Sequence, residues 1–247
     1  MMGKVLLVDI TKCNGCYNCQ IACKDEHVGN DWSPYAKPQP DTGQFWTRVV
    51  EHERGQIPRV RVNYSHMFCM HCDDAPCLDA CPSDAIYKRD DGIVIIDPEE
   101  CCGMKKCIDA CPYEDVIYFN NDLNIAQKCT FCAHLLDDDW EEPRCVEVCP
   151  TDALRFGDEE EFEGELDEFE VMLPEGVGSV DELEFEPRVY YKGLPERFVA
   201  GGVYDPSEDE CVEGAEVKLV NKESGEECSV VTDDFGDFWI RGLSEGE

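Results

Sequence analysis

The sequence predicts an α+β protein in which two small cysteine-rich modules precede a small β-rich C-terminal domain. Three observations lead to this prediction. Sixteen of the 18 cysteines lie in four tight groups between residues 13 and 149. A Cys-Pro-x-Asp-Ala stretch occurs twice, and each copy is followed by residues that favour a short strand. After residue 198, β-branched runs alternate with turn residues.

The spacing within the four cysteine groups indicates iron–sulfur ligation. Three thiolates at steps of three residues can hold three corners of one cuboidal cluster, and a fourth cysteine, usually before proline, reaches a second cluster. The groups are Cys13, Cys16, Cys19 and Cys23; Cys69, Cys72, Cys77 and Cys81; Cys101, Cys102, Cys107 and Cys111; and Cys129, Cys132, Cys145 and Cys149. Proline follows the last cysteine of the second, third and fourth groups.

Disulfides and zinc are the alternatives to iron. Disulfides would be strained between cysteines so close in the chain. The fourth group, taken alone, has the paired spacing of a zinc site, but four such groups in series favour iron. Cys211 and Cys228 lie outside the groups, and we expect small buried residues there rather than a disulfide, because oxygen-sensitive clusters suggest a reducing environment.

The repeated stretch supports the iron interpretation. Residues 81–86 (CPSDAI) match residues 149–154 (CPTDAL). A hairpin is expected between Tyr87 and Asp97, with Asp91 and Gly92 at its turn. A cluster loop, a short helix and a small hairpin form the ferredoxin pattern, so residues 1–157 resemble a polyferredoxin domain with two ferredoxin-like modules.

Residues 4–157 resemble, more specifically, the four-cluster iron–sulfur subunit of the dimethyl sulfoxide reductase family of molybdopterin oxidoreductases. The resemblance rests on the order of the four groups and on the pieces 70–72 (MHC), 75–77 (APC), 91–98 (DGIVIIDP) and 127–132 (QKCTFC). Further pieces, such as 25–27 (DEH), 133–138 (AHLLDD) and 187–192 (PRVYYK), are similar to small subunits of the pyrogallol–phloroglucinol transhydroxylase type.

The resemblance implies a ligand set for each cluster, in which the last cysteine of each group crosses to the cluster of another group. The first cluster would take Cys13, Cys16, Cys19 and Cys149; the second Cys129, Cys132, Cys145 and Cys23; the third Cys69, Cys72, Cys77 and Cys111; the fourth Cys101, Cys107 and Cys81. The first three would be [4Fe-4S] clusters. The remaining ligand position of the fourth cluster is occupied by Met104.

Met104 leaves three outcomes open for the fourth cluster, because a neutral thioether is a weak ligand beside a thiolate. The cluster can lack one iron as [3Fe-4S], Cys102 can complete a [4Fe-4S] cluster, or the site can be empty. We favour [3Fe-4S]. The five histidines (His27, His52, His66, His71 and His134) are expected to pack or to donate hydrogen bonds rather than to bind iron.

Residues 158–198 are predicted to form an acidic connecting segment. Nine of the thirteen residues from 158 to 170 are acidic, and the apolar Phe162, Leu166 and Phe169 interrupt them at helical spacing. A docked amphipathic segment and a solvated linker both fit this pattern.

Residues 199–247 are predicted to form a β-rich domain that resembles an immunoglobulin-like or transthyretin-like sandwich. Strands are expected at 199–204, 215–220, 227–232 and 237–240. Such a sandwich usually has about seven strands, so the domain is either minimal or incomplete.

The formal net charge of -35 argues against nucleic acid and anionic membranes as partners. Residues 1–150 contain 26 acidic and 14 basic side chains, and residues 151–247 contain 30 and 7. Both parts are negative, so one acidic tail does not explain the total. This indicates a halophilic surface, since concentrated salt screens its self-repulsion. A docking face for a basic partner is the alternative and would predict clustering.

The N-terminus lacks a signal-peptide layout, and no apolar run reaches the roughly 20 residues of a membrane span. We therefore expect a cytoplasmic chain, with export alongside a partner as the alternative. No nucleophile elbow, phosphate loop or metalloprotease motif is present, so we expect a non-catalytic subunit.

The resemblance implies an electron-transfer subunit with a large molybdopterin-containing catalytic partner, and it leaves a membrane anchor subunit open as a further member of the complex. Two other functions compete with this one. The chain could be the small subunit of a transhydroxylase-like molybdoenzyme whose clusters are partly structural, or a free polyferredoxin.

Overall fold

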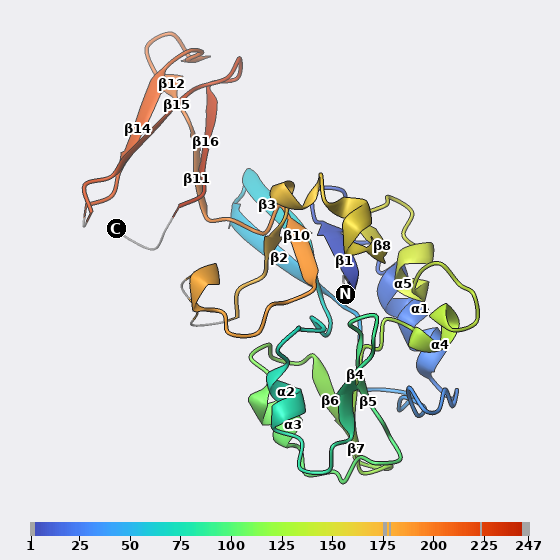
Figure 1. Cartoon of the computed structure of the whole chain (residues 1–247). Helices are drawn as coiled ribbons and strands as arrows, with labels where there is room; N and C mark the ends of the chain where they lie inside the picture. Colours follow the sequence, from blue (N-terminus) through green and yellow to red (C-terminus); the bar gives the residue numbers. More distant parts are fainter. Residues whose placement is uncertain (1–2, 175–176, 178, 223, 244–247) are drawn as a thin grey trace. The chain divides into compact units, whose positions relative to one another are not determined.

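The structure is a computed structural model that describes residues 3–174, 177, 179–222 and 224–243 (Figure 1). The chain divides into two units. Unit 1 comprises residues 1–50 and 64–194, and unit 2 comprises residues 51–63 and 195–247. These limits differ from the predicted boundaries after residues 157 and 198, because the strand that begins at Val189 returns to the sheet of unit 1.

Unit 1 contains a four-stranded sheet in the order β8-β1-β10-β9. Its strands are β1 (Lys4–Asp9), β8 (Leu154–Asp158), β9 (Glu170–Val171) and β10 (Val189–Lys192). β1 pairs in parallel with β10 and antiparallel with β8, so that Leu6 lies opposite both Val189 and Phe156. The continuous apolar sequence of β1 suits this position, because a strand that is covered on both faces buries side chains of both orientations.

The acidic segment is docked on β1 rather than solvated. Phe162 is buried with Val5 and Leu7 of β1, and Leu166 and Phe169 pack against them. The segment forms two short 3-10 helices, η1 (Glu159–Phe162) and η2 (Leu166–Glu168), instead of one α-helix. Its apolar positions therefore cover one face of the sheet, while its carboxylates stay at the surface.

Five short α-helices accompany the cysteine groups: α1 (Asn18–His27), α2 (Pro76–Asp79), α3 (Lys106–Ala110), α4 (Ala133–Leu136) and α5 (Arg144–Glu147). α1 packs beside α5, and α2 packs beside α3 (Figure 1). The residues before α1, α3 and α4 (Tyr17, Lys105 and Cys132) all have a positive φ, between 50° and 61°. The chain thus turns sharply in a cysteine loop before each of these helices begins.

Two hairpins lie between the second and fourth cysteine groups. The predicted hairpin is confirmed as β4 (Ile86–Lys88) and β5 (Val94–Ile96), with Gly92 at a φ of 85° in its turn. The second hairpin consists of β6 (Ile117–Asn120) and β7 (Ile125–Lys128). Neither strand of this second hairpin was expected from the sequence, although β6 is rich in β-branched and aromatic residues.

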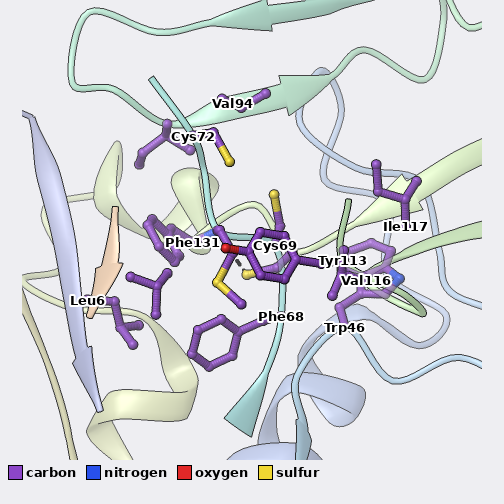
Figure 2. Close-up of a cluster of buried hydrophobic side chains, with 14 of the residues drawn as sticks. Leu6, Trp46, Phe68, Cys69, Cys72, Val94, Tyr113, Val116, Ile117 and Phe131 are labelled. Carbon is purple, nitrogen blue, oxygen red and sulfur yellow. Dashed lines mark hydrogen bonds between the residues drawn. The ribbon is translucent and has the colours of Figure 1, made fainter. Parts of the chain in front are cut away.

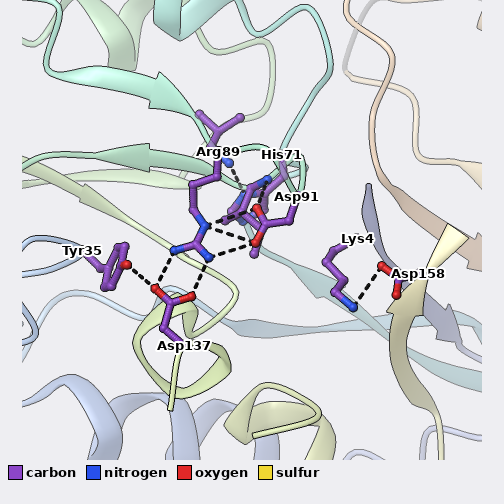
Figure 3. Close-up of polar contacts among 9 residues, drawn as sticks. Lys4, Tyr35, His71, Arg89, Asp91, Asp137 and Asp158 are labelled. Carbon is purple, nitrogen blue, oxygen red and sulfur yellow. Dashed lines mark hydrogen bonds and ion pairs between the residues drawn. The ribbon is translucent and has the colours of Figure 1, made fainter. Parts of the chain in front are cut away.

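A polar network fixes the first hairpin. Arg89 donates to both carboxylate oxygens of Asp137, at 2.7 and 3.0 Å, and also bonds to Asp91 (Figure 3). The Tyr35 hydroxyl donates to Asp137 as well. Hydrogen bonds from Arg89 and Tyr35 lower the pKa of Asp137 to about 2. The hairpin is therefore tied to the loop after α4 by a carboxylate that stays ionised at neutral pH.

The core of unit 1 is built around the cysteines. Nine of the cysteines are buried, and aromatic side chains such as Trp46, Phe68 and Phe131 are buried with them (Figure 2). Tyr191 of β10 is fully buried, and its hydroxyl donates to the His66 carbonyl oxygen at 2.9 Å. No helix among the described residues is long and apolar enough to span a membrane.

Unit 2 is formed by short antiparallel strand pairs: β11 (Phe198–Gly202) with β16 (Asp237–Arg241), β12 (Tyr204–Asp205) with β13 (Glu210–Cys211), and β14 (Glu216–Val220) with β15 (Glu227–Val231). The four predicted strands are confirmed at nearly the expected residues. The hairpin of β2 (Arg48–Gln56) and β3 (Arg59–Met67) runs from unit 1 into unit 2 and back. A last short helix, η3 (Val180–Glu182), belongs to unit 1.

The prediction that the two remaining cysteines are buried is wrong for Cys211, which is exposed. It lies in the two-residue strand β13, which pairs only with the equally short β12 in the described part of the chain. This two-residue pairing is too small to cover the Cys211 side chain. Cys228 is half-buried, and both cysteines are free thiols.

Candidate metal centres

The thiols of Cys13, Cys16, Cys19 and Cys149 lie together and are called the first set. Burial raises the pKa of Cys19 to about 12, and the nearby thiols of Cys13, Cys149 and Cys16 add to the rise. Burial likewise raises the pKa of Cys13, with Cys149 and Cys16 again as neighbours. Cys149 thus joins three cysteines that lie more than 120 residues earlier in the chain, as the family resemblance implies.

The second set contains Cys23, Cys129, Cys132 and Cys145. All four thiols are buried, and burial raises the pKa of Cys145 well above its ordinary value, with contributions from Cys132, Cys129 and Cys23. Cys23 lies in α1 and Cys145 in α5, whereas Cys129 and Cys132 precede α4. The packing of α1 beside α5 brings these loops together.

The third set contains Cys69, Cys72, Cys77 and Cys111. Burial raises the pKa of Cys72, and Cys69, Cys111 and Cys77 raise it further. Burial also raises the pKa of Cys111 to about 12. Cys111 directly follows α3 and Cys77 lies in α2, so the packing of α2 beside α3 repeats the arrangement of the second set.

The fourth set contains three thiols, Cys81, Cys101 and Cys107. Burial raises the pKa of Cys107 to about 11, with further contributions from Cys101 and Cys81. Met104 is 56% exposed, and the thiol of Cys102 is also exposed. Met104 at the fourth ligand position and the nearby Cys102 are therefore both exposed, whereas the other three sets each contain four thiols.

The four sets follow one another in a row. Cys145 of the second set interacts with Cys19 of the first, and Cys129 of the second set interacts with Cys69 of the third. Cys107 of the fourth set interacts with Cys77 and Cys111 of the third. Each of these interactions raises a thiol pKa, so thiols of neighbouring sets lie close enough to influence each other.

The second and third sets share one local geometry. In Cys69-Met70-His71-Cys72 the His71 N–H donates to the Cys69 sulfur at 3.4 Å, and in Cys129-Thr130-Phe131-Cys132 the Phe131 N–H donates to the Cys129 sulfur at 3.4 Å. His71 and Phe131 both have a positive φ, 47° and 48°, and their rings stack with centroids 3.8 Å apart. A backbone N–H directed at sulfur stabilises its negative charge, which is typical of cysteines that bind metal clusters.

The donor chemistry of the third set fits an iron–sulfur cluster. A cavity is lined by all four of its thiols and by apolar side chains. The cavity lining consists of Cys69, Met70, Cys72, Ala75, Pro76, Cys77, Val94, Cys111, Pro112, Tyr113 and Ile117. Four sulfur donors in a hydrocarbon lining suit a cluster of iron and sulfide that is shielded from water.

A single metal ion fits the thiols less well. Within the described ranges, no three or more His, Cys, Asp or Glu side chains converge on one ion position.

Three of the five histidines are placed as packing and hydrogen-bonding residues. His71 Nδ1 accepts a hydrogen bond from the Val94 N–H at 3.1 Å. His27 is buried against Trp46, with Nε2 4.0 Å from the Cys132 sulfur. His134 stacks on Trp32 and bonds to Glu26.

Sequence reasoning did not single out Lys128, which the structure buries between the second and third sets. Its side chain is 2% exposed, and Nζ donates to the carbonyl oxygens of Val94 and Cys129. The only available signal was its place directly before Cys129 in the piece 127–132.

Comparisons with known proteins agree with this arrangement. Residues 60–159 match the family model described as a 4Fe-4S dicluster domain. The pyrogallol hydroxytransferase small subunit of Pelobacter acidigallici is 40% identical over 253 residues, which cover 98% of this chain and 87% of that protein.

Two further relatives match much of the chain. The thiosulfate reductase electron transfer subunit of Salmonella typhi is 36% identical over 64% of this chain and 78% of its own length. The formate dehydrogenase-O iron–sulfur subunit of Escherichia coli is 33% identical over 77% of this chain and 70% of its own length. With four consecutive sets of thiols and these relatives, the chain belongs to the family of iron–sulfur electron-transfer subunits of dimethyl sulfoxide reductase-type molybdopterin oxidoreductases.

Proposed function

We propose that this chain relays electrons to or from a molybdopterin-containing catalytic subunit through four iron–sulfur sites, three [4Fe-4S] and one [3Fe-4S]. The observation that supports this proposal most strongly is the row of four thiol sets, in which each set interacts with the next. Iron–sulfur clusters, when bound, accept and release single electrons at potentials of roughly -700 to +450 mV. The first set would hold one end of the row and the fourth set the other.

The contribution of the chain itself is to hold, bury and polarise the ligands. Burial of the second set in hydrocarbon excludes water, and the N–H groups of His71 and Phe131 donate to ligand sulfurs. Burial and hydrogen bonds to sulfur are the means by which a protein sets the potential of such a site.

A second candidate function is supported by the match to the hydroxytransferase small subunit, which extends over 98% of the chain. In this alternative the chain is the small subunit of a transhydroxylase-like molybdoenzyme, and its clusters are partly structural. A catalytic partner of the molybdopterin class is common to both functions. A membrane anchor subunit in the same complex would favour the relay.

We also propose a halophilic surface. The net charge of -35 is shared by both halves of the sequence, and among the described residues many carboxylates of the acidic segment remain exposed after it docks. Concentrated salt would screen their repulsion. The cytoplasm remains the expected location.

The first prediction concerns metal content. Purified without oxygen from its own host, the chain should be accompanied by a larger molybdopterin-containing chain. It should carry about fifteen irons with a [3Fe-4S] fourth cluster, or about sixteen if that cluster is complete. Metal analysis and mass spectrometry of the complex measure both. Stoichiometric zinc with little iron would contradict the proposal.

The second prediction concerns Met104. A three-thiolate [3Fe-4S] site is paramagnetic when oxidised, so the protein as isolated should give an electron paramagnetic resonance signal before any reductant is added. Met104→Cys should remove this signal and add one iron per chain, whereas Cys102→Ser should leave it unchanged. If Cys102→Ser instead destroys a reduced [4Fe-4S] signal in the wild-type background, Cys102 is the fourth ligand. About twelve irons without the signal would mean an empty fourth site.

The third prediction concerns pH after the iron is removed by a chelator. Folded thiols such as Cys19 and Cys111 have their pKa raised to about 12, whereas unfolded thiols ionise near pH 8.5. As the pH rises above that value, the unfolded chain loses protons first, so the stability of the metal-free chain should fall between about pH 8 and pH 11. The loaded protein should show the opposite trend and weaken toward acid, because protons displace metal from thiolates.

Thermal unfolding followed by circular dichroism across this pH range checks both trends. A metal-free chain whose melting temperature is constant from about pH 8 to pH 11 would contradict the role of the buried thiols.

The fourth prediction concerns salt. If the surface is halophilic, dialysis from about 3 M to about 0.1 M salt should unfold the chain, because the Debye length grows from a few ångströms to about 10 Å. Circular dichroism measures the loss, and return to high salt should restore secondary structure. Full retention of structure at low salt would favour a docking face for a basic partner.

A further inference from the structure

Lys128 is a buried ammonium group without a carboxylate partner. It ends β7, its side chain is 2% exposed, and Nζ has two acceptors, the carbonyl oxygens of Val94 and Cys129, the latter at 3.1 Å. Within the described part of the chain, no aspartate or glutamate pairs with it. Lysine is almost never fully buried unless its charge is compensated.

The cost of such a site shows that something must balance the charge. Removing an ammonium group from water costs several kcal/mol even after relaxation, and two hydrogen bonds to neutral carbonyl groups offset only part of that cost. The groups near Lys128 that can supply this balance are cysteines, which are thiolates when they bind a cluster. Lys128 lies close enough to Cys129 of the second set, and to Cys77 and Cys111 of the third, to lower each thiol pKa.

Lys128 lies next to both the second and the third set. Cys129, the next residue, belongs to the second set. Val94, which accepts from Nζ, lines the cavity of the third set and lies beside Cys72 (Figure 2). The carbonyl groups of these two residues therefore hold the ammonium between the two sites.

We propose that Lys128 is a shared counter-charge that sets the potentials of the second and third clusters together. This inference rests on the proposed function, since it requires clusters in both sets. A cluster becomes more negative by one charge on reduction, so a nearby ammonium stabilises the reduced form more than the oxidised form. Lys128 thereby raises both midpoint potentials and favours the presence of the electron on this central pair of sites.

A purely structural role is the competing explanation. The bond from Lys128 to Val94 joins hairpin β6-β7 to hairpin β4-β5, and a tie of this kind would need no charge. Lys128→Met keeps the length of the side chain and removes its charge and donors. Lys128→Gln removes the charge and keeps an amide donor, so a structural tie would be partly retained.

Lys88→Met serves as the matched control. Lys88 lies in β4 of the same pair of hairpins, but it is partly exposed and its ammonium pairs with Asp73. Asp73 keeps Arg188 as a partner at 2.6 Å when Lys88 is replaced, so the loss of this partly exposed charge should have little effect on the clusters.

The experiment is a redox titration of the anaerobically purified, iron-loaded protein, followed by electron paramagnetic resonance. In Lys128→Met and in Lys128→Gln, two of the four midpoint potentials should fall, each by about a tenfold change in the ratio of oxidised to reduced cluster, which equals ~59 mV for one electron. The other two potentials, and all four in Lys88→Met, should stay unchanged.

Other outcomes overturn the inference. Unchanged potentials in a fully loaded Lys128→Met protein show that the role is structural. A shift of one potential alone shows that Lys128 is not shared. If Lys128→Met loses iron, the Lys128→Gln protein is titrated instead. Wild-type potentials in Lys128→Gln would then show that the hydrogen bonds of Lys128 matter and its charge does not. Failure of the wild-type chain to bind iron would refute the proposed function itself. Metal analysis of the wild-type protein detects this failure before any variant is titrated, so the two refutations are distinguishable.

Discussion

The thiol of Cys149 lies with those of Cys13, Cys16 and Cys19, and this convergence of cysteines from opposite ends of the cysteine-rich region constrains the rest of unit 1. The same exchange recurs when Cys23 joins the second set and Cys111 joins the third. Both ends of the cysteine-rich region must therefore lie side by side. The pairing of β1 with β8 and the packing of α1 beside α5 meet this requirement.

Metal binding and folding are coupled in such an arrangement. The helices of unit 1 that carry the ligands are short, and four of the five have only four or five residues, too few to be stable on their own. Much of the core that they cover consists of cysteine. Buried thiols without metal remain protonated neighbours, whereas thiolates bound to iron link loops that are distant in the sequence.

The charges of unit 1 are distributed unequally between surface and interior. The surface carries most of the acidic residues that make the net charge -35, and salt screens them. The interior contains Lys128 between two sets of thiols. Salt screens the electrostatic interactions of a buried charge much less than those of an exposed one. The surface carboxylates therefore have little effect on the buried Lys128, because salt screens the interactions of the carboxylates much more than those of the lysine with its neighbours.

The sequence by itself determined the local features: the cysteine groups, the turn at Gly92 and the strands of unit 2, because spacing, glycine at a positive φ and β-branched runs act within a few residues. The tertiary structure alone decided how distant segments meet. It paired β10 with β1, docked Phe162 of the acidic segment on Val5 and Leu7, and enclosed Lys128. Composition could not distinguish a docked acidic segment from a solvated one, nor a buried lysine from an exposed one. In each case the partner that decides the outcome lies far away in the chain.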